Sequence, residues 1–303
     1  MVWPLLRQPE GRHNTCPAKK EVTLLQSSGN WIIDILNYTL NFWSEAMQTI
    51  WTLLTTSPQN IRSGAVWSAI ANIQGGLKAI AYALLVLFFI VGVVKTTTNF
   101  AEIKRPEVAL KLFIRFAIAK AVVGYSMDIL TGIFKIGHGI LNNISAHAGG
   151  VLTTGITLPD AIAQKINQCS FLDSIPLWIV ALIGALLVTV LSFVMILTVY
   201  SRIFKIFMYT AVAPIPLASF AGEGTSQVGR QFLKSYAGVC LQGVVIILAC
   251  IVYSVLTENP PINTNGNATT VVWAFLFQLI FNFLVLVGAV KMSDRVVKEM
   301  IGF

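Results

Sequence analysis

Charged residues are scarce in this sequence. Asp, Glu, Lys and Arg make up 11% of the 303 residues, whereas hydrophobic residues make up 55%. A soluble domain carries about 25% charged residues, so the composition excludes a single water-soluble core. The few charges are also unbalanced, with 21 Lys and Arg against 13 Asp and Glu, which gives a net charge of +8. In a membrane protein, the positions of this excess report topology.

Cysteine and histidine are also rare, and they are not spaced as metal ligands. The four cysteines contain no CxxC pair and the three histidines no HExxH motif, so the sequence gives no basis for zinc chemistry. Residues 224–229 have the glycine spacing of a phosphate loop, but Arg230 and Gln231 replace the required Lys and Ser or Thr. We therefore expect no enzymatic activity, no metal and no cofactor.

Long apolar runs recur and predict an all-α, polytopic membrane protein. A hydrocarbon core about 30 Å thick requires about 20 residues of helix. Four runs approach or exceed this length, at 77–94, 175–200, 236–256 and 271–290. A fifth stretch, 108–142, has the helical period but carries several charges. We expect about five transmembrane helices.

The charges of the fifth stretch share one helix face with small residues. At 100° per residue, Lys120, Gly124, Asp128 and Lys135 fall within a stripe about 100° wide. A charge in lipid costs about 2.5 to 3.5 kcal/mol, and small residues allow helices to approach closely. This stripe is therefore expected to face a helix bundle, a subunit interface or water. Two alternatives stay open for Asp128: it is paired within a bundle, or it lines a hydrated pore.

The N-terminal region predicts an amphipathic helix. Polar residues recur at three- and four-residue steps from Asp34 to Thr52, and Trp31, Trp43 and Trp51 supply rings favoured at a bilayer interface. We expect this helix to lie on the membrane surface; the alternative is that its apolar face packs on its own domain. The expected organisation has three parts: a disordered tail (1–28), an amphipathic interfacial helix (29–57) and a transmembrane helical domain (58–303).

Residues 203–220 are apolar but contain a lysine and two prolines, Pro214 and Pro216. Basic residues mark the cytoplasmic side of a span, and both Arg202 before this segment and Arg230 after it fit that side only if the segment does not cross. A re-entrant hairpin broken at the prolines meets this condition, with its backbone covered by protein or water. The alternative is a proline-kinked surface helix. The same rule places the N-terminus outside and the C-terminus in the cytoplasm.

Two stretches of the chain resemble a known family. The first is KRPEVALKLFIRFAIAK at 104–120; the second contains YSRIFK at 200–205, APIP at 213–216, FAGE at 220–223 and FLKSY at 232–236. They resemble TrbL-like polytopic channel subunits of conjugative type IV secretion systems, in the form carried by integrative elements of Gram-positive bacteria. The resemblance implies about five spans, an external N-terminus, an internal C-terminus, and a cell-membrane channel that passes single-stranded DNA with its attached relaxase.

The resemblance also implies partners: other membrane subunits, separate ATPases, the transferred strand with its relaxase, lipid and further copies of the chain. Basic residues on the cytoplasmic side are candidates for contact with the strand's phosphates. They are Lys104, Arg105, Arg202, Lys205, Arg230 and Lys234. Positive-inside anchoring predicts the same residues without nucleic acid, so both explanations stay open.

Two other classes of function remain at this point. One is a non-conducting structural scaffold. The other is a small-solute or ion transporter, which needs polar groups near the middle of the membrane. Lys120, Asp128, Gln278 and Asn282 are the residues that supply them.

Overall fold

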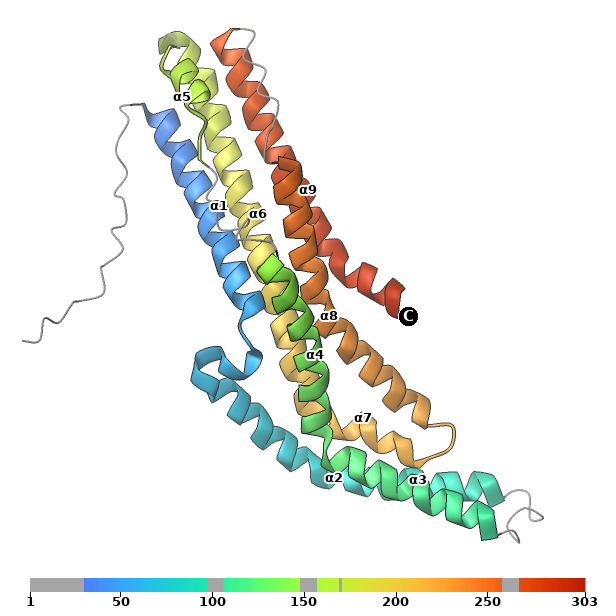
Figure 1. The fold of residues 1–303 in the computed structure, drawn as a ribbon. Helices are drawn as coiled ribbons and strands as arrows, with labels where there is room; N and C mark the ends of the chain where they lie inside the picture. The colour runs from blue at the N-terminus through green and yellow to red at the C-terminus, as the bar shows by residue number, and fades with distance from the viewer. Residues whose placement is uncertain (1–29, 98–105, 148–156, 169–170, 258–266, 303) are drawn as a thin grey trace, which may run out of the picture.

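The computed structural model describes residues 30–97, 106–147, 157–168, 171–257 and 267–302 (Figure 1). The predicted disordered tail, 1–28, lies outside these ranges. Within them the chain is helical almost throughout, and no strand occurs. The α-helices are α1 (Trp31–Thr55), α2 (Ala65–Thr97), α3 (Pro106–Gly124), α4 (Ser126–His147), α5 (Asp160–Asn167), α6 (Phe171–Val212), α7 (Pro214–Ala218), α8 (Ser226–Thr257) and α9 (Ala268–Ile301). Two 3₁₀ segments complete the set, η1 (Pro58–Gly64) and η2 (Ser219–Ala221).

Several of these helices are long and apolar enough to cross a membrane. They are the segments Ala65–Lys95 of α2, Ile175–Val212 of α6, Ser226–Val255 of α8 and Thr269–Ile301 of α9. A fifth crossing results if α3 and α4 are counted as one span, although a bend of 68° separates them. The predicted all-α polytopic class is confirmed.

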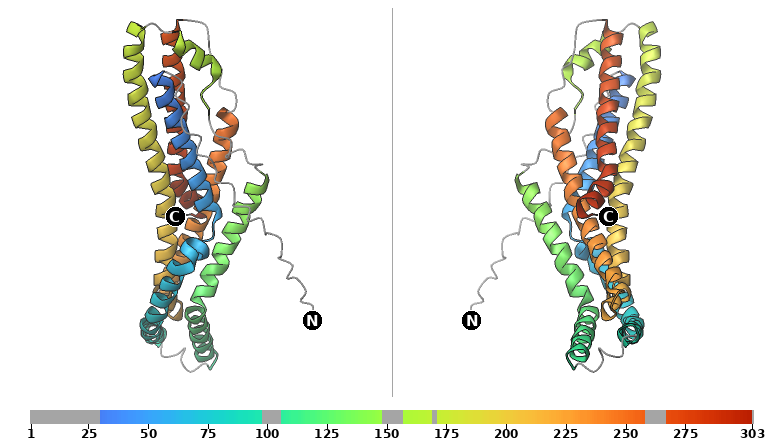
Figure 2. Two further views of the ribbon diagram at one scale, coloured as in Figure 1. Left: turned by 90° about the vertical axis from the view of Figure 1, so that its left-hand side faces the viewer. Right: turned by 90° about the vertical axis from the view of Figure 1, so that its right-hand side faces the viewer.

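The larger apolar core lies between α1, α6, α8 and α9, which run side by side in Figures 1 and 2. Leu40 of α1, Val188 of α6, Ile246 of α8 and Leu286 of α9 are all buried in it. These residues recur at helical spacing along each element, so each helix turns one apolar stripe inward. This bundle is the frame on which the remaining helices pack.

The apolar face of α1 is covered by protein. Asn30 caps the helix, its Oδ1 accepting a hydrogen bond from the Ile32 amide at 3.2 Å. Trp43 stacks on Phe283 of α9 with ring centroids 3.9 Å apart, and Phe42 lies 5.8 Å from Phe193 of α6. The structure therefore gives the second of the two alternatives from the sequence: the apolar face packs on the chain's own domain, not on lipid.

A second apolar core forms where α2 and α3 pair and pack on α7 and η2 (Figure 1). Ala81 of α2, Val123 of α3 and Leu217 of α7 are buried there. The turn after η2 touches α2 through glycine: a Cβ on Gly222 would lie 2.8 Å from the carbonyl oxygen of Phe88. Only glycine permits so close a backbone approach.

The proline-containing segment differs from the hairpin expected at 203–220. Residues 203–212 continue α6 without interruption, so they do not form a separate arm. The chain breaks only at Pro214, which begins α7 and has no amide hydrogen to extend the α6 ladder. The break therefore lies at a turn between two long helices, α6 and α8, and Pro214 is buried in that turn.

Candidate functional site

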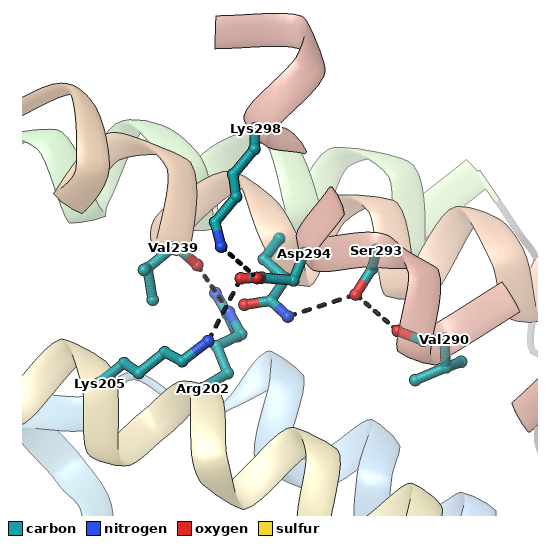
Figure 3. A network of polar contacts seen from close by, with 8 residues as sticks. Arg202, Lys205, Val239, Val290, Ser293, Asp294 and Lys298 are labelled. Carbon is teal, nitrogen blue, oxygen red and sulfur yellow. Dashed lines mark hydrogen bonds and ion pairs between the residues drawn. The ribbon is translucent and has the colours of Figure 1, made fainter. Parts of the chain in front are cut away.

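A layer of polar side chains crosses the bundle where α6, α8 and α9 meet (Figure 3). Asp294 of α9 is its centre: Oδ1 lies 3.2 Å from Nζ of Lys205 on α6, and Oδ2 lies 2.8 Å from Nζ of Lys298 on α9. One carboxylate thus bridges two lysines from different helices. All three side chains keep partial contact with solvent, so the pairs are screened and fix geometry more than they stabilise.

Arg202 lies in the same layer but is fully buried, with 4% of its surface exposed. Its Nε donates to the carbonyl oxygen of Val239 at 3.0 Å, and Nη2 donates to that of Cys240 at 3.1 Å. Gly243, one turn further along α8, leaves the space that the guanidinium fills. Within the described parts of the chain, no carboxylate pairs with Arg202. Backbone carbonyls instead satisfy this buried cation.

A neutral hydrogen-bond chain completes the layer. Nε2 of Gln242 on α8 donates to Oγ of Ser293 on α9 at 3.3 Å, and this hydroxyl donates to the carbonyl oxygen of Val290 at 2.6 Å. All of these groups are buried. The Oε1 atom of Gln242 has no hydrogen-bond partner among the residues that the structure describes. These hydrogen bonds link α8 to α9 beside Arg202.

The six basic residues expected to contact nucleic acid separate into three groups. Lys104 and Arg105 lie outside the described residues. Arg202 is buried and hydrogen-bonded to backbone carbonyls of α8, so its guanidinium is not on the surface of this structure. In the sequence Arg202 stands at the end of an apolar run, and this position does not indicate that α8 covers its side chain.

The remaining members are more accessible. Lys205 is half-buried and paired with Asp294. Arg230 and Lys234 are exposed at the start of α8, where they line a surface depression of ≈ 340 Å³ with Gln227, Gln231 and Gly302. Gln231 also lines a neighbouring cavity of ≈ 320 Å³, together with Lys205, Asp294 and Lys298. Four cations and one carboxylate therefore surround two adjoining hollows at this end of the bundle.

The predicted single helix at 108–142 is two helices. The chain bends by 68° between α3 and α4, with Gly124 as the last residue of α3. Lys120 lies before this bend, whereas Asp128 and Lys135 lie after it on α4, and all three side chains are exposed. No ion pair or hydrogen bond joins any of them to another residue in the described ranges. The stripe is thus turned away from the interior of the chain.

Polar residues of α2 hold the bend between α3 and α4. Nζ of Lys78 donates to the carbonyl oxygen of Gly124 at 2.9 Å, and Nε2 of Gln74 donates to Oγ of Ser126 at 3.2 Å. The last carbonyls of a helix lack internal partners and attract a cation, so Lys78 stabilises the end of α3. Neither residue was predicted from the sequence; the pattern that could have indicated them is two polar residues one helical turn apart at the start of an apolar run.

The polar residues considered for a solute transporter do not converge. Gln278 Nε2 donates to Asn282 Oδ1 at 3.3 Å, so these two pair with each other along α9. Lys120 and Asp128 lie on α3 and α4. Among the described residues, no group of three or more His, Cys, Asp or Glu side chains has metal-site geometry.

Comparison with known proteins gives a single assignment. No curated protein and no solved structure matches the chain. The family model for TrbL/VirB6 plasmid conjugal transfer like proteins matches residues 44–214. This match covers more than half of the 303 residues and runs from α1 through the break at Pro214. The chain therefore belongs to the TrbL/VirB6 plasmid conjugal transfer-like family and is a multi-pass membrane component of type IV secretion.

Proposed function

We propose that this chain is a non-enzymatic channel subunit of a conjugative type IV secretion system in the cell membrane. It passes single-stranded DNA, with its bound relaxase, through the cytoplasmic membrane. Family membership supports a secretion role. The observation that carries the channel assignment is that three charged residues, Lys120 on α3 and Asp128 and Lys135 on α4, are exposed on a bent helix pair that counts together as one candidate span.

The exposed stripe requires an assembly of several chains. Each of its charges would cost about 2.5 to 3.5 kcal/mol if it faced lipid. The chain itself offers these side chains no partner in the described ranges. Gly124 lies at the bend between them, next to the hydroxyl of Tyr82. In the proposed oligomer the stripe faces the shared centre, where other copies and water replace lipid.

We infer the orientation of the chain in the membrane from the positions of its basic residues. Arg230 and Lys234 begin α8, and Lys298 ends α9 at the same end of the bundle. Because basic residues favour the cytoplasmic side, this end is cytoplasmic, the C-terminus is inside and the start of α1 is outside. The two basic hollows then meet the polyanionic strand where it enters.

Energy and recognition come from other chains in this proposal. The membrane and ATPase subunits of the secretion system are its partners, and lipid surrounds the exposed apolar faces of α6 and α9. The role of this subunit is to provide a path, through which the strand moves without a covalent step.

Site-specific photocrosslinking in mating donor cells tests the proposal. A photoreactive amino acid is placed at Lys234 or Asp128, with Leu186 as the control because it is exposed on the apolar side of α6. The chain is then purified and tested for the transferred strand. An adduct at Lys234 or Asp128, absent at Leu186 and absent in donors without relaxase, supports the proposal.

The remaining outcomes of this experiment distinguish the two alternative functions, a transporter and a scaffold. Normal conjugation without an adduct at either position contradicts the channel role. Solute flux in liposomes that contain only this chain would then indicate a transporter. Neither adduct nor flux would indicate a structural scaffold.

A further inference from the structure

The polar face of α1 begins near the depth of the membrane centre. Phe42 contacts Phe193, close to the middle of the apolar segment Ile175–Val212, and Trp43 stacks on Phe283, close to the middle of Thr269–Ile301. The side of α1 that faces these helices is apolar. The opposite side is polar, and it lies at a depth where lipid would otherwise surround the bundle.

This face is well defined along the helix. Asn41, Glu45, Gln48 and Thr52 are all exposed. They follow steps of four, three and four residues, which place them within about 60° of one another around the axis. Glu45 has no ion pair within the described residues. Four polar side chains in hydrocarbon would each cost free energy, so lipid does not cover this face.

A hydrogen bond joins the face of α1 to the charged face of α4. Nε2 of His138 donates to the carbonyl oxygen of Thr55 at 2.9 Å, and its Nδ1 accepts from Nδ2 of Asn142 at 3.2 Å. Thr55 follows Thr52 on the polar side of α1, and His138 follows Lys135 on α4. Figures 1 and 2 both show the end of α1 beside the upper part of α4. The two polar faces therefore meet end to end.

Together they form one surface, which we name the polar track. It consists of Asn41, Glu45, Gln48 and Thr52 of α1, and of Asp128, Lys135 and His138 of α4. At 1.5 Å per residue, the α1 part up to Thr55 is about 21 Å long and the α4 part about 15 Å. Because Asn41 adjoins Phe42, near the middle of the apolar segments, the polar track runs from the membrane centre towards the end of the bundle where α8 begins. Half of the hydrocarbon layer is about 15 Å thick, so the polar track is long enough to cross that half.

We propose that the polar track lines the cytoplasmic half of a water-filled passage through the membrane, with α1 as a lining helix. This inference rests on the proposed channel function and deepens it, because it names the surface that the strand passes. The polar track carries charges of both signs and several neutral polar groups, so it keeps water beside a passing polyanion without binding its phosphates tightly. The basic hollows at the cytoplasmic end instead attract the strand.

Cysteine accessibility in whole donor cells tests this assignment. In a background without Cys16, Cys169, Cys240 and Cys250, single cysteines replace Asn41, Gln48 or Lys135. Phe281→Cys and Leu197→Cys are the controls, since both positions are exposed on apolar surfaces of α9 and α6. Because only a hydrated thiolate reacts, a charged methanethiosulfonate reagent should modify the track cysteines at least about tenfold faster than the controls. Equal, slow reaction at all five positions overturns the inference.

A second measurement separates a lining helix from one that lies on the membrane surface. Cysteines at Phe42 and Phe193 should be joined by a short bifunctional thiol reagent, because these side chains are in contact. Fast labelling of Asn41→Cys without this crosslink would place α1 at the surface and refute the proposal. Crosslinking of track cysteines between copies, without labelling, would make the track a dry subunit interface and refute it as well.

The two proposals fail in different ways. If the track cysteines are labelled and the strand never crosslinks to the chain, the passage is real but does not carry DNA. If the strand crosslinks while the track cysteines stay unlabelled, the channel role holds and the assigned lining is wrong.

Discussion

The guanidinium of Arg202, on α6, occupies the space that a side chain at Gly243, on α8, would need. A Cβ on Gly243 would collide with the end of the Arg202 side chain. That end is hydrogen-bonded to the carbonyls of Val239 and Cys240 and is buried, so it cannot move aside into solvent. The spacing between α6 and α8 is therefore set by this pair.

Replacing Gly243 by alanine should destabilise the protein by about 1 to 3 kcal/mol, because the added methyl group overpacks a buried site. The expected readout is a lower midpoint of thermal unfolding in detergent and lower abundance in the membrane. Gly288→Ala is the matched control, since no atom lies within 4 Å of a Cβ there. A Gly243→Ala protein as stable as the control would contradict the packing described here.

The loss caused by Gly243→Ala should be partly reversed by Arg202→Met. The Val239 and Cys240 carbonyls lie inside α8 and keep their helical hydrogen bonds when the guanidinium is removed, and a flexible methionine can accommodate the methyl group. A double-mutant cycle on unfolding midpoints measures the coupling, which should favour the double variant by about 0.5 to 3 kcal/mol. Additive losses would show that the two residues act independently.

Lys78→Met should lower abundance, because it removes the hydrogen bond to the last carbonyl of α3. The expected loss is about 1 kcal/mol, as for a cation at a helix C-terminus. Lys120→Met, in the neighbouring helix, removes an exposed lysine without a described partner, so abundance should stay near normal while conjugation falls. Quantitative immunoblotting and mating frequency, measured on both variants, check this difference. Equal abundance would argue against a role for Lys78 at the bend.

Asp294→Asn and Asp128→Asn should affect different properties, the first stability and the second DNA transfer. Asp294 bridges Lys205 and Lys298, and losing its charge should cost about 1 kcal/mol for these partly exposed pairs. Asp128 has no described partner, so Asp128→Asn should leave the unfolding midpoint unchanged and alter transfer frequency. A large drop in stability for Asp128→Asn would mean that a residue from another chain pairs with it.

The sequence predicted the membrane helices well, because length and hydropathy act locally. The runs at 175–200, 236–256 and 271–290 lie within α6, α8 and α9. Helix ends were less predictable: α8 begins at Ser226, ten residues before its apolar run, because packing on η2 extends it. The bend between α3 and α4 was not predicted either. Its polar contacts come from Gln74 and Lys78 on α2, and contacts between helices cannot be seen in the local sequence.

The site residues were predictable in type but not in setting. An arginine at the end of an apolar run is usually an anchor at the interface. Arg202 departs from that pattern only because Gly243, far away in the sequence, leaves a space beside it. For α1, the periodicity of the sequence defined the apolar face correctly. Periodicity alone does not indicate whether protein or lipid covers that face, and in the structure α6 and α9 cover it.

The length of α6 limits how this protein can sit in a bilayer. Its 42 residues make a rod of about 63 Å at 1.5 Å per residue. Even at a tilt of 40°, the steepest usual for such helices, a 30 Å hydrocarbon layer holds only about 39 Å of it. About 24 Å must project beyond the hydrocarbon, yet large apolar side chains stay exposed from Ile175 to Val212. The projecting part therefore has to be sheathed by neighbouring protein, and a lone copy would leave it uncovered.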